Sequence, residues 1–378
     1  MAGIVNFMWG SLGKWISGQA VSGLDRCSFY RTDSILSFNI IRCDGWAMAG
    51  GGSIIAEMLG GLLVLGLVMI AIALVFAGTV IVVMALMLLR PRRMKDGRAI
   101  FMLQRLSPAD LGMEFEDVSF QVIDQSSGEK LNIAGWWIAN PVARGRCAVI
   151  LHGYSDAKVG GIAWAPLLHE LGFAILAIDL RAHGESGGVY STAGFWERHD
   201  VNQVIDQLKA ARPAESLQLL LFGISLGAAT AAATAAMRND LWAVILECPF
   251  SDFHRAAGYQ ADRLSTPGKL FQDSAYYLAK WISRADFDAV RPTEMIPKIL
   301  CPLMVIQSCD DPFLSAEDLA AVRGAVESRS EAQGPSICWA LPGTHHVVGM
   351  RENPDEYKRR IEDFLSKVLH NPVEVCEK

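Results

Sequence analysis

The most apolar stretch of the chain runs from Met58 to Leu89 and holds no charged residue in 32 positions. An α-helix rises 1.5 Å per residue, so this stretch would be roughly 48 Å long, well beyond the ~30 Å hydrocarbon core of a bilayer. It is too short for two spans with a turn between them. The pattern therefore predicts one transmembrane helix, at about residues 62–86, that is tilted or has an apolar overhang.

From about Glu114 the pattern changes to short apolar runs that alternate with amphipathic stretches. Two runs on either side of a Ser-Ser-Gly turn, Val118–Ile123 and Leu131–Ala139, predict an antiparallel pair of strands. Further strands are predicted at Cys147–Leu151, Phe173–Leu180, Leu217–Phe222, Trp242–Leu246, Leu303–Ile306 and Ile337–Leu341. Helices are predicted at Ile162–Leu171, Trp196–Ala211, Ser315–Ser328 and Pro354–Leu369. This alternation is typical of an α/β fold with a mostly parallel sheet and helices on both faces.

One predicted strand runs into a serine between two glycines. The apolar run ends at Gly223-Ile224-Ser225-Leu226-Gly227, and an alanine-rich segment follows directly. A G-x-S-x-G sequence between a strand and a helix is typical of a sharp turn that presents the serine hydroxyl at the carboxyl edge of a sheet. The five residues alone are a weak signal, because a serine in such a turn often has no chemical role. The flanking strand and helix make Ser225 a candidate nucleophile.

A serine hydroxyl at neutral pH needs a base within hydrogen-bond reach and an acid that orients the base. Two adjacent histidines follow the last predicted strand, and His346 is preferred as the base over His345. Two adjacent aspartates follow the preceding strand, and Asp311 is preferred as the acid over Asp310. Asp252 is a third possible acid. An aspartate in such a loop ordinarily caps a helix, so position and chain order carry the assignment.

An acyl-transfer site also needs two donors for the oxyanion, each worth roughly 3 kcal/mol when well aimed. The N–H of Leu226 opens a predicted helix, where backbone donors are unpaired and the dipole favours negative charge. The second donor is expected from His152-Gly153-Tyr154, the loop after the strand Cys147–Leu151. Gly153 permits a tight turn there, so the N–H of Tyr154 can point into the site. The His152 side chain is assigned a structural role.

The stretch Ser251–Pro297 interrupts the alternation of strands and helices. It is rich in Tyr, Phe, Trp and Ala and has Pro267-Gly268 in its middle. Long insertions between core elements are usually functional. We therefore expect a helical cap over the site at about residues 251–297, with the Pro-Gly as its internal turn. The alternative is a helix packed away from the pocket.

Residues 114–370 resemble the α/β-hydrolase superfamily, especially its serine aminopeptidase-like and lysophospholipase-like branch. The matching pieces are His152-Gly153-Tyr154, Asp179-Leu180-Arg181-Ala182-His183-Gly184-Glu185-Ser186-Gly187, Gly223-Ile224-Ser225-Leu226-Gly227, Asp311-Pro312 and Gly343-Thr344-His345-His346. The chain order Ser225, Asp311, His346 is also that of the superfamily. The resemblance implies that the second piece is a structural loop beside the oxyanion strand, so His183 is not the base. The family's usual glycines before the acid and the base are replaced here by Ser308 and His345.

Basic residues follow the apolar stretch at once, at Arg90, Arg92, Arg93, Lys95, Arg98 and Arg105. Cationic flanks stay on the cytoplasmic side of a membrane, so the C-terminal domain is predicted to be cytoplasmic. The cluster would also contact anionic headgroups, whereas the simpler alternative is that the arginines only anchor the helix end. The predicted organisation is a leader at 1–57, a transmembrane helix at 58–89, a basic connector at 90–113, a hydrolase domain at 114–370 and a tail at 371–378.

Composition narrows the classes of function. The chain has 34 Lys and Arg against 40 Asp and Glu, a formal net charge of −6, so it lacks the basic field that binds nucleic acid. Its eight cysteines include no C-x-x-C and no Cys/His cluster with zinc spacing, so no metal is predicted. Buried free thiols in a reducing compartment are favoured, although Cys27 and Cys43 could pair in an oxidising space.

The sequence thus predicts a single-pass, membrane-anchored serine hydrolase with Ser225 as nucleophile, His346 as base and Asp311 as orienting acid. The N–H groups of Tyr154 and Leu226 would hold the oxyanion, and water would release the acyl group. The mechanism needs no metal or organic cofactor. A carboxylic ester is the first choice of substrate, ahead of a thioester or amide, because an ester needs less leaving-group assistance. The membrane setting favours a small acyl or lipid-like substrate.

Two alternatives belong to other classes. A serine peptidase of the aminopeptidase type would need acidic residues near the pocket to bind a free amino terminus, and Glu247 and Asp252 are the candidates. A non-catalytic, hydrolase-like binding protein is the second alternative. An intact serine, aspartate and histidine in the expected order argues against it.

Overall fold

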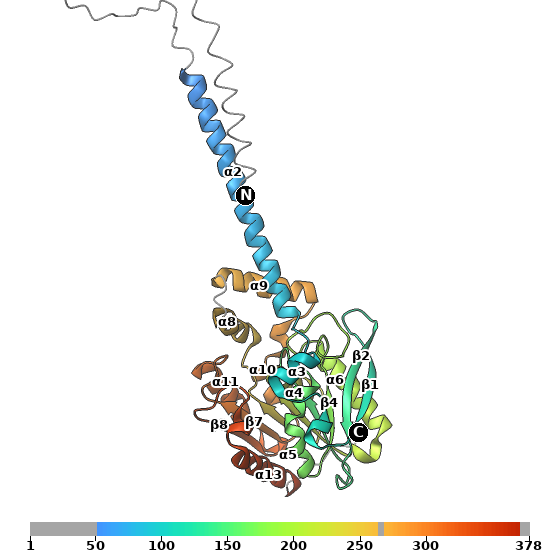
Figure 1. Ribbon diagram of the computed structural model, residues 1–378. Helices are drawn as coiled ribbons and strands as arrows, with labels where there is room; N and C mark the ends of the chain where they lie inside the picture. The colour runs from blue at the N-terminus through green and yellow to red at the C-terminus, as the bar shows by residue number, and fades with distance from the viewer. Residues whose placement is uncertain (1–50, 264–267, 371–378) are drawn as a thin grey trace, which may run out of the picture. The chain divides into compact units, whose positions relative to one another are not determined.

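The computed structural model describes residues 51–263 and 268–370 (Figure 1). The chain divides into two compact units, Met1–Leu74 and Val75–Lys378. The predicted tail, most of the predicted leader and any pairing of Cys27 with Cys43 lie outside the described residues.

Helix α2 runs from Gly51 to Leu89, so it begins inside the predicted leader and continues to the end of the predicted span. Its segment Ala56–Leu89 is long and apolar enough to cross a membrane, and an 18-residue window within it has a mean hydropathy of 2.9 and no buried residue. The last turns differ, because Ala85 and Leu89 are completely buried. Both of these residues belong to the second unit.

Eight strands of the second unit form one sheet in the order β1-β2-β4-β3-β5-β6-β7-β8. The strands are β1 (Glu116–Ile123), β2 (Lys130–Ile138), β3 (Arg146–Leu151), β4 (Ala174–Ile178), β5 (Gln218–Ile224), β6 (Ala243–Glu247), β7 (Leu303–Ser308) and β8 (Ser336–Leu341). β1 and β2 form the predicted antiparallel pair, and β2 is also antiparallel to β4. All pairs from β4 to β8 are parallel. The predicted α/β-hydrolase class, with a mostly parallel sheet, is confirmed.

The sheet is covered on both faces, and alternate residues of a strand enter different cores. In β3, Val149 and Leu151 join one apolar cluster, whereas Ala148 and Ile150 join the other. The first cluster includes residues of α6 (Glu197–Ala211), α7 (Leu226–Ala235), α10 (Pro292–Met295) and α11 (Ala316–Glu327). The second includes residues of α3 (Asp96–Leu103), α4 (Lys158–Gly161), α5 (Ala165–Glu170) and α13 (Pro354–His370). The short helix α12 spans Gly349–Glu352.

The single helix predicted at Ile162–Leu171 is wrong in detail. The segment follows the short α4 directly and holds a 3₁₀ turn at Ile162–Trp164 and then α5, which begins at Ala165. Pro166 explains the break, because proline lacks an N–H and fits the first turn of a helix better than its interior.

The predicted cap region forms two helices, α8 (Phe253–Arg263) and α9 (Lys269–Ser283) (Figure 1). Residues 264–267 between them lie outside the described part. Phe253 and Tyr276 pack with Phe287 in an aromatic cluster, which holds the two helices against the segment that follows α9. The predicted helices are therefore present.

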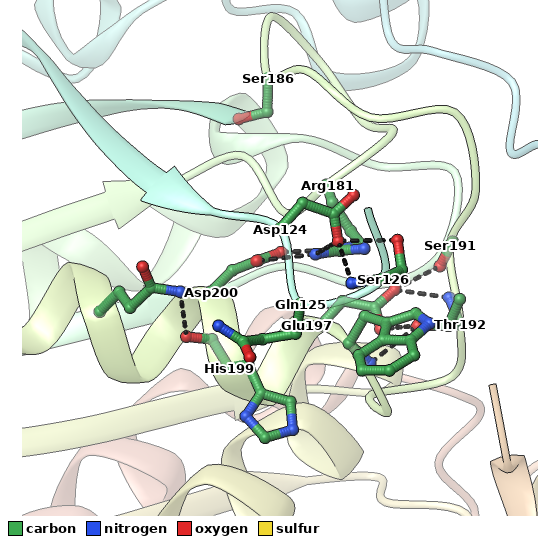
Figure 2. A network of polar contacts seen from close by, with 12 residues as sticks. Asp124, Gln125, Ser126, Arg181, Ser186, Ser191, Thr192, Glu197, His199 and Asp200 are labelled. Atoms are coloured by element: carbon green, nitrogen blue, oxygen red, sulfur yellow. Dashed lines mark hydrogen bonds and ion pairs between the residues drawn. The ribbon is translucent and has the colours of Figure 1, made fainter. Parts of the chain in front are cut away.

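The loop after β4 is held by buried ionic contacts (Figure 2). Arg181 donates to both carboxylate oxygens of Asp200, at 2.6 and 2.8 Å, and to Asp124 at 3.1 Å. Burial raises the pKa of Asp200 to about 6, and the Arg181 contacts oppose that rise. The nearby Glu197 accepts hydrogen bonds from the Ser191 and Thr192 hydroxyls. These contacts tie the loop to α6 and to the β1–β2 turn, so Arg181 supports the fold.

Candidate active site

Ser225 lies on a strained turn between β5 and α7. Its backbone angles are φ 54° and ψ −112°, in the region that favours glycine. The turn is held because the Ser225 N–H donates to the carbonyl oxygen of Glu247 at 2.8 Å. Backbone strain of this kind costs of order 1–3 kcal/mol and clusters at functional sites. The turn lifts the hydroxyl clear of the carboxyl edge of the sheet, as the sequence pattern predicts.

The two glycines of the motif let the end of β5, the start of α7 and the end of β3 approach one another closely. A Cβ added to Gly227 would overlap the carbonyl of Leu151, at the end of β3. A Cβ added to Gly223 would overlap the backbone of Gly227 itself. The first turn of α7 is therefore pressed against the end of β3, where the next loop begins.

A chain of hydrogen bonds joins the three predicted catalytic side chains. His346 Nε2 lies 2.9 Å from Ser225 Oγ, and His346 Nδ1 lies 2.5 Å from Asp311 Oδ2. Asp311 is buried, and its other oxygen accepts the N–H of Phe313 at 2.9 Å. The Phe313 ring packs edge-on against His346, with ring centroids 4.9 Å apart. The serine, base and acid thus converge from the loops after β5, β8 and β7.

The alternative residues point elsewhere. His345 Nδ1 contacts the carbonyl oxygen of Asp310 at 3.0 Å and lies on the exposed side of the loop. Asp252 is paired with Arg291 at 2.6 Å. His183 is fully buried, with Nδ1 on the carbonyl oxygen of Arg181, and burial lowers its pKa to about 3. None of these side chains has a hydrogen bond to Ser225 in the described part of the chain.

The two predicted oxyanion donors flank the serine. Leu226 is the first residue of α7, and a Cβ added to Gly153 would lie 3.5 Å from the Ser225 Cβ, so the loop carrying Tyr154 passes beside it. Within the described residues, neither the Leu226 nor the Tyr154 N–H has an acceptor. His152, in the same loop, accepts the Leu180 N–H at 3.0 Å and is fully buried, which fits its predicted structural role.

The side chain of Tyr154 makes a contact that sequence reasoning missed. Its hydroxyl reaches the carbonyl oxygens of Met87 and Leu88, at 2.6 and 3.1 Å. These carbonyls close the last turn of α2, where helix acceptors have no partner in the helix. The tyrosine that carries an oxyanion donor is thereby fixed to the end of the apolar helix.

One group of side chains near the triad has a composition found in metal sites. Ligand atoms of Cys248, Asp311 and His346 lie within 4.8 Å of one another. Burial raises the pKa of the Cys248 thiol to about 12, and this thiol contacts the Ser308 hydroxyl at 3.3 Å. Both ring nitrogens of His346 already have partners. The donor set therefore fits a catalytic triad better than a metal centre.

Glu247 does not line an amine-binding pocket. Its carboxylate is buried and accepts the Tyr357 hydroxyl at 2.5 Å, and Trp164 donates to that hydroxyl at 3.0 Å. Burial raises the pKa of Glu247 to about 7, and these hydrogen bonds oppose the rise. Among the described residues, Glu247 is hydrogen-bonded to the serine turn through its backbone carbonyl and not through its carboxylate.

This buried carboxyl should make stability depend on pH. Because its pKa in the folded state exceeds the ordinary value, ionisation favours unfolding, and stability is lost as pH rises through about 7. Relative to Glu247→Gln, the wild type should lose roughly 3 kcal/mol between pH 5 and 8. Urea unfolding of the detergent-solubilised chain at several pH values measures this. The exposed Glu170→Gln is the matched control and should leave the pH profile unchanged, whereas parallel profiles for Glu247→Gln and wild type would contradict the prediction.

Comparison with known proteins adds relatives of the same architecture. Residues 143–291 match the family described as serine aminopeptidase, S33. The Bacillus subtilis protein YqkD, which is uncharacterized, is 25% identical over 273 residues, covering 68% of this chain and 83% of its own length. The Pyrococcus furiosus esterase Pf2001 is 23% identical with a TM-score of 0.58, covering 73% of this chain and 98% of that one. The α/β hydrolase GrgF from Penicillium sp. sh18 is 19% identical with a TM-score of 0.51, covering 68% and 100%.

Proposed function

This chain belongs to the α/β-hydrolase superfamily, and from that premise we propose that it is a serine hydrolase with Ser225 as its nucleophile. The observation that carries the proposal is the hydrogen-bonded series Ser225–His346–Asp311, at 2.9 and 2.5 Å. A base within reach of the serine and an acid within reach of the base are what nucleophilic activation requires.

The reaction follows from this geometry. Ser225 Oγ attacks the acyl carbon while His346 Nε2 takes the hydroxyl proton, and the carbonyl oxygen becomes an oxyanion held by the N–H groups of Tyr154 and Leu226. The imidazolium, stabilised by Asp311, gives its proton to the leaving group as the acyl-enzyme forms. Water then attacks the acyl carbon of the acyl-enzyme, with His346 as base, and this step releases the carboxylic acid product and the free Ser225 hydroxyl.

An ester is the favoured substrate. The two acidic residues considered for binding a free amino terminus are engaged elsewhere, since Glu247 is buried under Tyr357 and Asp252 is paired with Arg291. Short-chain p-nitrophenyl esters and aminoacyl p-nitroanilides offered to the full chain in detergent test this. We expect turnover of the esters and little of the anilides. Faster anilide cleavage would favour a peptidase, and inertness of folded protein to both and to fluorophosphonates would favour a binding protein.

We further propose that the enzyme is anchored to a membrane by residues 58–89, with its catalytic domain in the cytoplasm. The apolar segment of α2 supports the anchor, and the exposed Arg90, Arg92 and Lys95 after it support the orientation. Labelling of Cys376 with an impermeant thiol reagent tests the orientation. Labelling from outside intact cells would reverse it.

A further inference from the structure

Helix α9 carries large apolar side chains on the face turned away from the protein. Leu270, Tyr277 and Trp281 are 78%, 61% and 78% exposed. Their spacing of seven and four residues places them on one face, opposite the buried Ala275 and Ala279. A helix on a water-exposed surface normally carries polar residues there. Exposed apolar side chains of this size on one helix face mark an interaction surface.

The inner face of α9 packs on the end of the apolar helix. Ala85 and Leu89 of α2 lie in the same buried cluster as Ala275 and Ala279, and Leu88 packs against it. One side of the last turns of α2, which includes Ala85 and Leu89, is therefore covered by protein and needs no lipid, while Met87 stays exposed. This accounts for an apolar run of 32 residues where a span needs about 20. The helix would leave the hydrocarbon at the level of its contact with α9.

The charges and aromatic residues of α9 are those of a helix at the membrane–water boundary. Lys269 and Arg284, at its two ends, are exposed and have no ion pair among the described residues. Tryptophan and tyrosine concentrate at the membrane–water boundary, and a helix with one apolar face and cationic flanks lies in the plane of that boundary. Exposed Arg90, just after α2, adds cationic charge at the end of α2.

We propose that α9 is an in-plane membrane helix, whose outer face of Leu270, Tyr277 and Trp281 lies in the headgroup region of the phospholipid bilayer that α2 crosses. The occupant of this face is the bilayer itself. The surface is distinct from the catalytic triad and does not depend on it.

Two contacts link elements that pack on α9 with loops of the candidate site. Arg263, the last residue of α8, lies over the Phe313 ring at 5.6 Å, and Phe313 packs on His346. On the other side, Tyr154 holds the carbonyl of Met87 at the end of α2. The loops that carry Asp311 and Tyr154 therefore contact α8 and the end of α2, which both pack on α9. On the proposed function, this assigns the substrate class as acyl esters that reside in the bilayer.

Depth-dependent quenching tests the surface without using activity. The full chain, with its other accessible cysteines changed to serine, carries a bimane label at Trp281→Cys and is placed in phosphatidylcholine–phosphatidylglycerol vesicles with brominated acyl chains. Leu217→Cys is the matched control, because Leu217 is 72% exposed and precedes β5, at the edge of the sheet opposite Ser225. We expect strong quenching at 281 and little at 217. Equal quenching, or none at 281 together with cross-linking to a second copy, would overturn the proposal.

A second measurement tests the substrate class. Combined Leu270→Ser, Tyr277→Ser and Trp281→Ser should lower hydrolysis of a long-chain ester in the bilayer by about tenfold, with hydrolysis of a soluble short ester unchanged. An equal effect on both esters would overturn the substrate class. If the wild type hydrolyses neither and its Ser225 resists fluorophosphonate, the proposed function fails, while the quenching result still decides the membrane surface.

Discussion

Replacing Ser225 with alanine should abolish labelling by a fluorophosphonate and lower kcat/KM for esters by roughly 10⁴-fold or more. The variant removes the only hydroxyl that His346 Nε2 contacts in the described part of the chain, so no covalent intermediate can form. The proposed oxyanion donors are retained, so a small residual rate is expected. Probe labelling and ester hydrolysis by the full chain in detergent measure both effects.

Ser283→Ala is the matched control for this experiment. Ser283 is a buried serine, whereas Ser225 is half-buried, and the Ser283 hydroxyl donates to the carbonyl of Ala279 within α9 and has no contact with the triad. It should label and hydrolyse like the wild type. Full labelling of a folded Ser225→Ala protein would place the nucleophile at another residue.

The sequence predicted the central strands well because their patterns are local. β3, β5 and β6 are buried on both faces and therefore read as unbroken apolar runs between helices. The strand order was not predictable in this way, nor was the second antiparallel partner of β2. The strand order and this pairing both depend on which apolar segments come into contact when the chain folds. The predicted helix at Ile162–Leu171 is divided because of Pro166. This proline is a local signal, but the helical prediction followed the hydrophobic periodicity instead.

Within the candidate site, the serine was the easiest residue to identify. Its turn is specified by five adjacent residues, and the crowding around Gly223 and Gly227 leaves little alternative there. The acid and base were less certain because each has a neighbour of the same type. Adjacent side chains in a loop point in different directions, and only the backbone decides which one faces Ser225. At the base, that backbone includes Val347 at φ 58°, an unusual conformation for a β-branched residue.

Long-range contacts of single side chains could not be predicted at all. Arg93, which the sequence assigns only to a basic connector, donates to the carbonyl oxygens of Gly184 and Ser186 at 2.8 and 2.6 Å. The Tyr154 hydroxyl contact with Met87 joins segments 67 residues apart. Nothing in the residue pattern of either segment specifies the partner. These contacts attach the end of α2 to the loop after β3 and its connector to the loop after β4.

Each predicted catalytic side chain has a neighbour of the same type, His345 beside His346 and Asp310 beside Asp311. Comparing the two members of each pair tests the assignment of the acid and the base. We expect His346→Ala to lower kcat by roughly 10⁴-fold, because Ser225 then has no base, and Asp311→Asn to lower it by on the order of 10³–10⁴-fold. The asparagine keeps the size of the side chain but loses the charge that stabilises the imidazolium, and it favours the wrong imidazole tautomer. Since both losses affect the chemical step, KM for a soluble ester should change little.

The adjacent variants, His345→Ala and Asp310→Asn, are the controls. His345 contacts the Asp310 carbonyl, which Asp310→Asn retains, so neither variant alters a bond to Ser225 or His346. Both should keep kcat within about threefold of the wild type, as substitutions outside the reacting groups usually do. A loss at His345 as large as that at His346 would reassign the base, and a loss at Asp310 in place of Asp311 would reassign the acid. Each control residue is the sequence neighbour of its test residue in the same loop. Altered folding of the loop would therefore lower the activity of the control and of the test variant alike, whereas loss of a catalytic group would lower only that of the test variant.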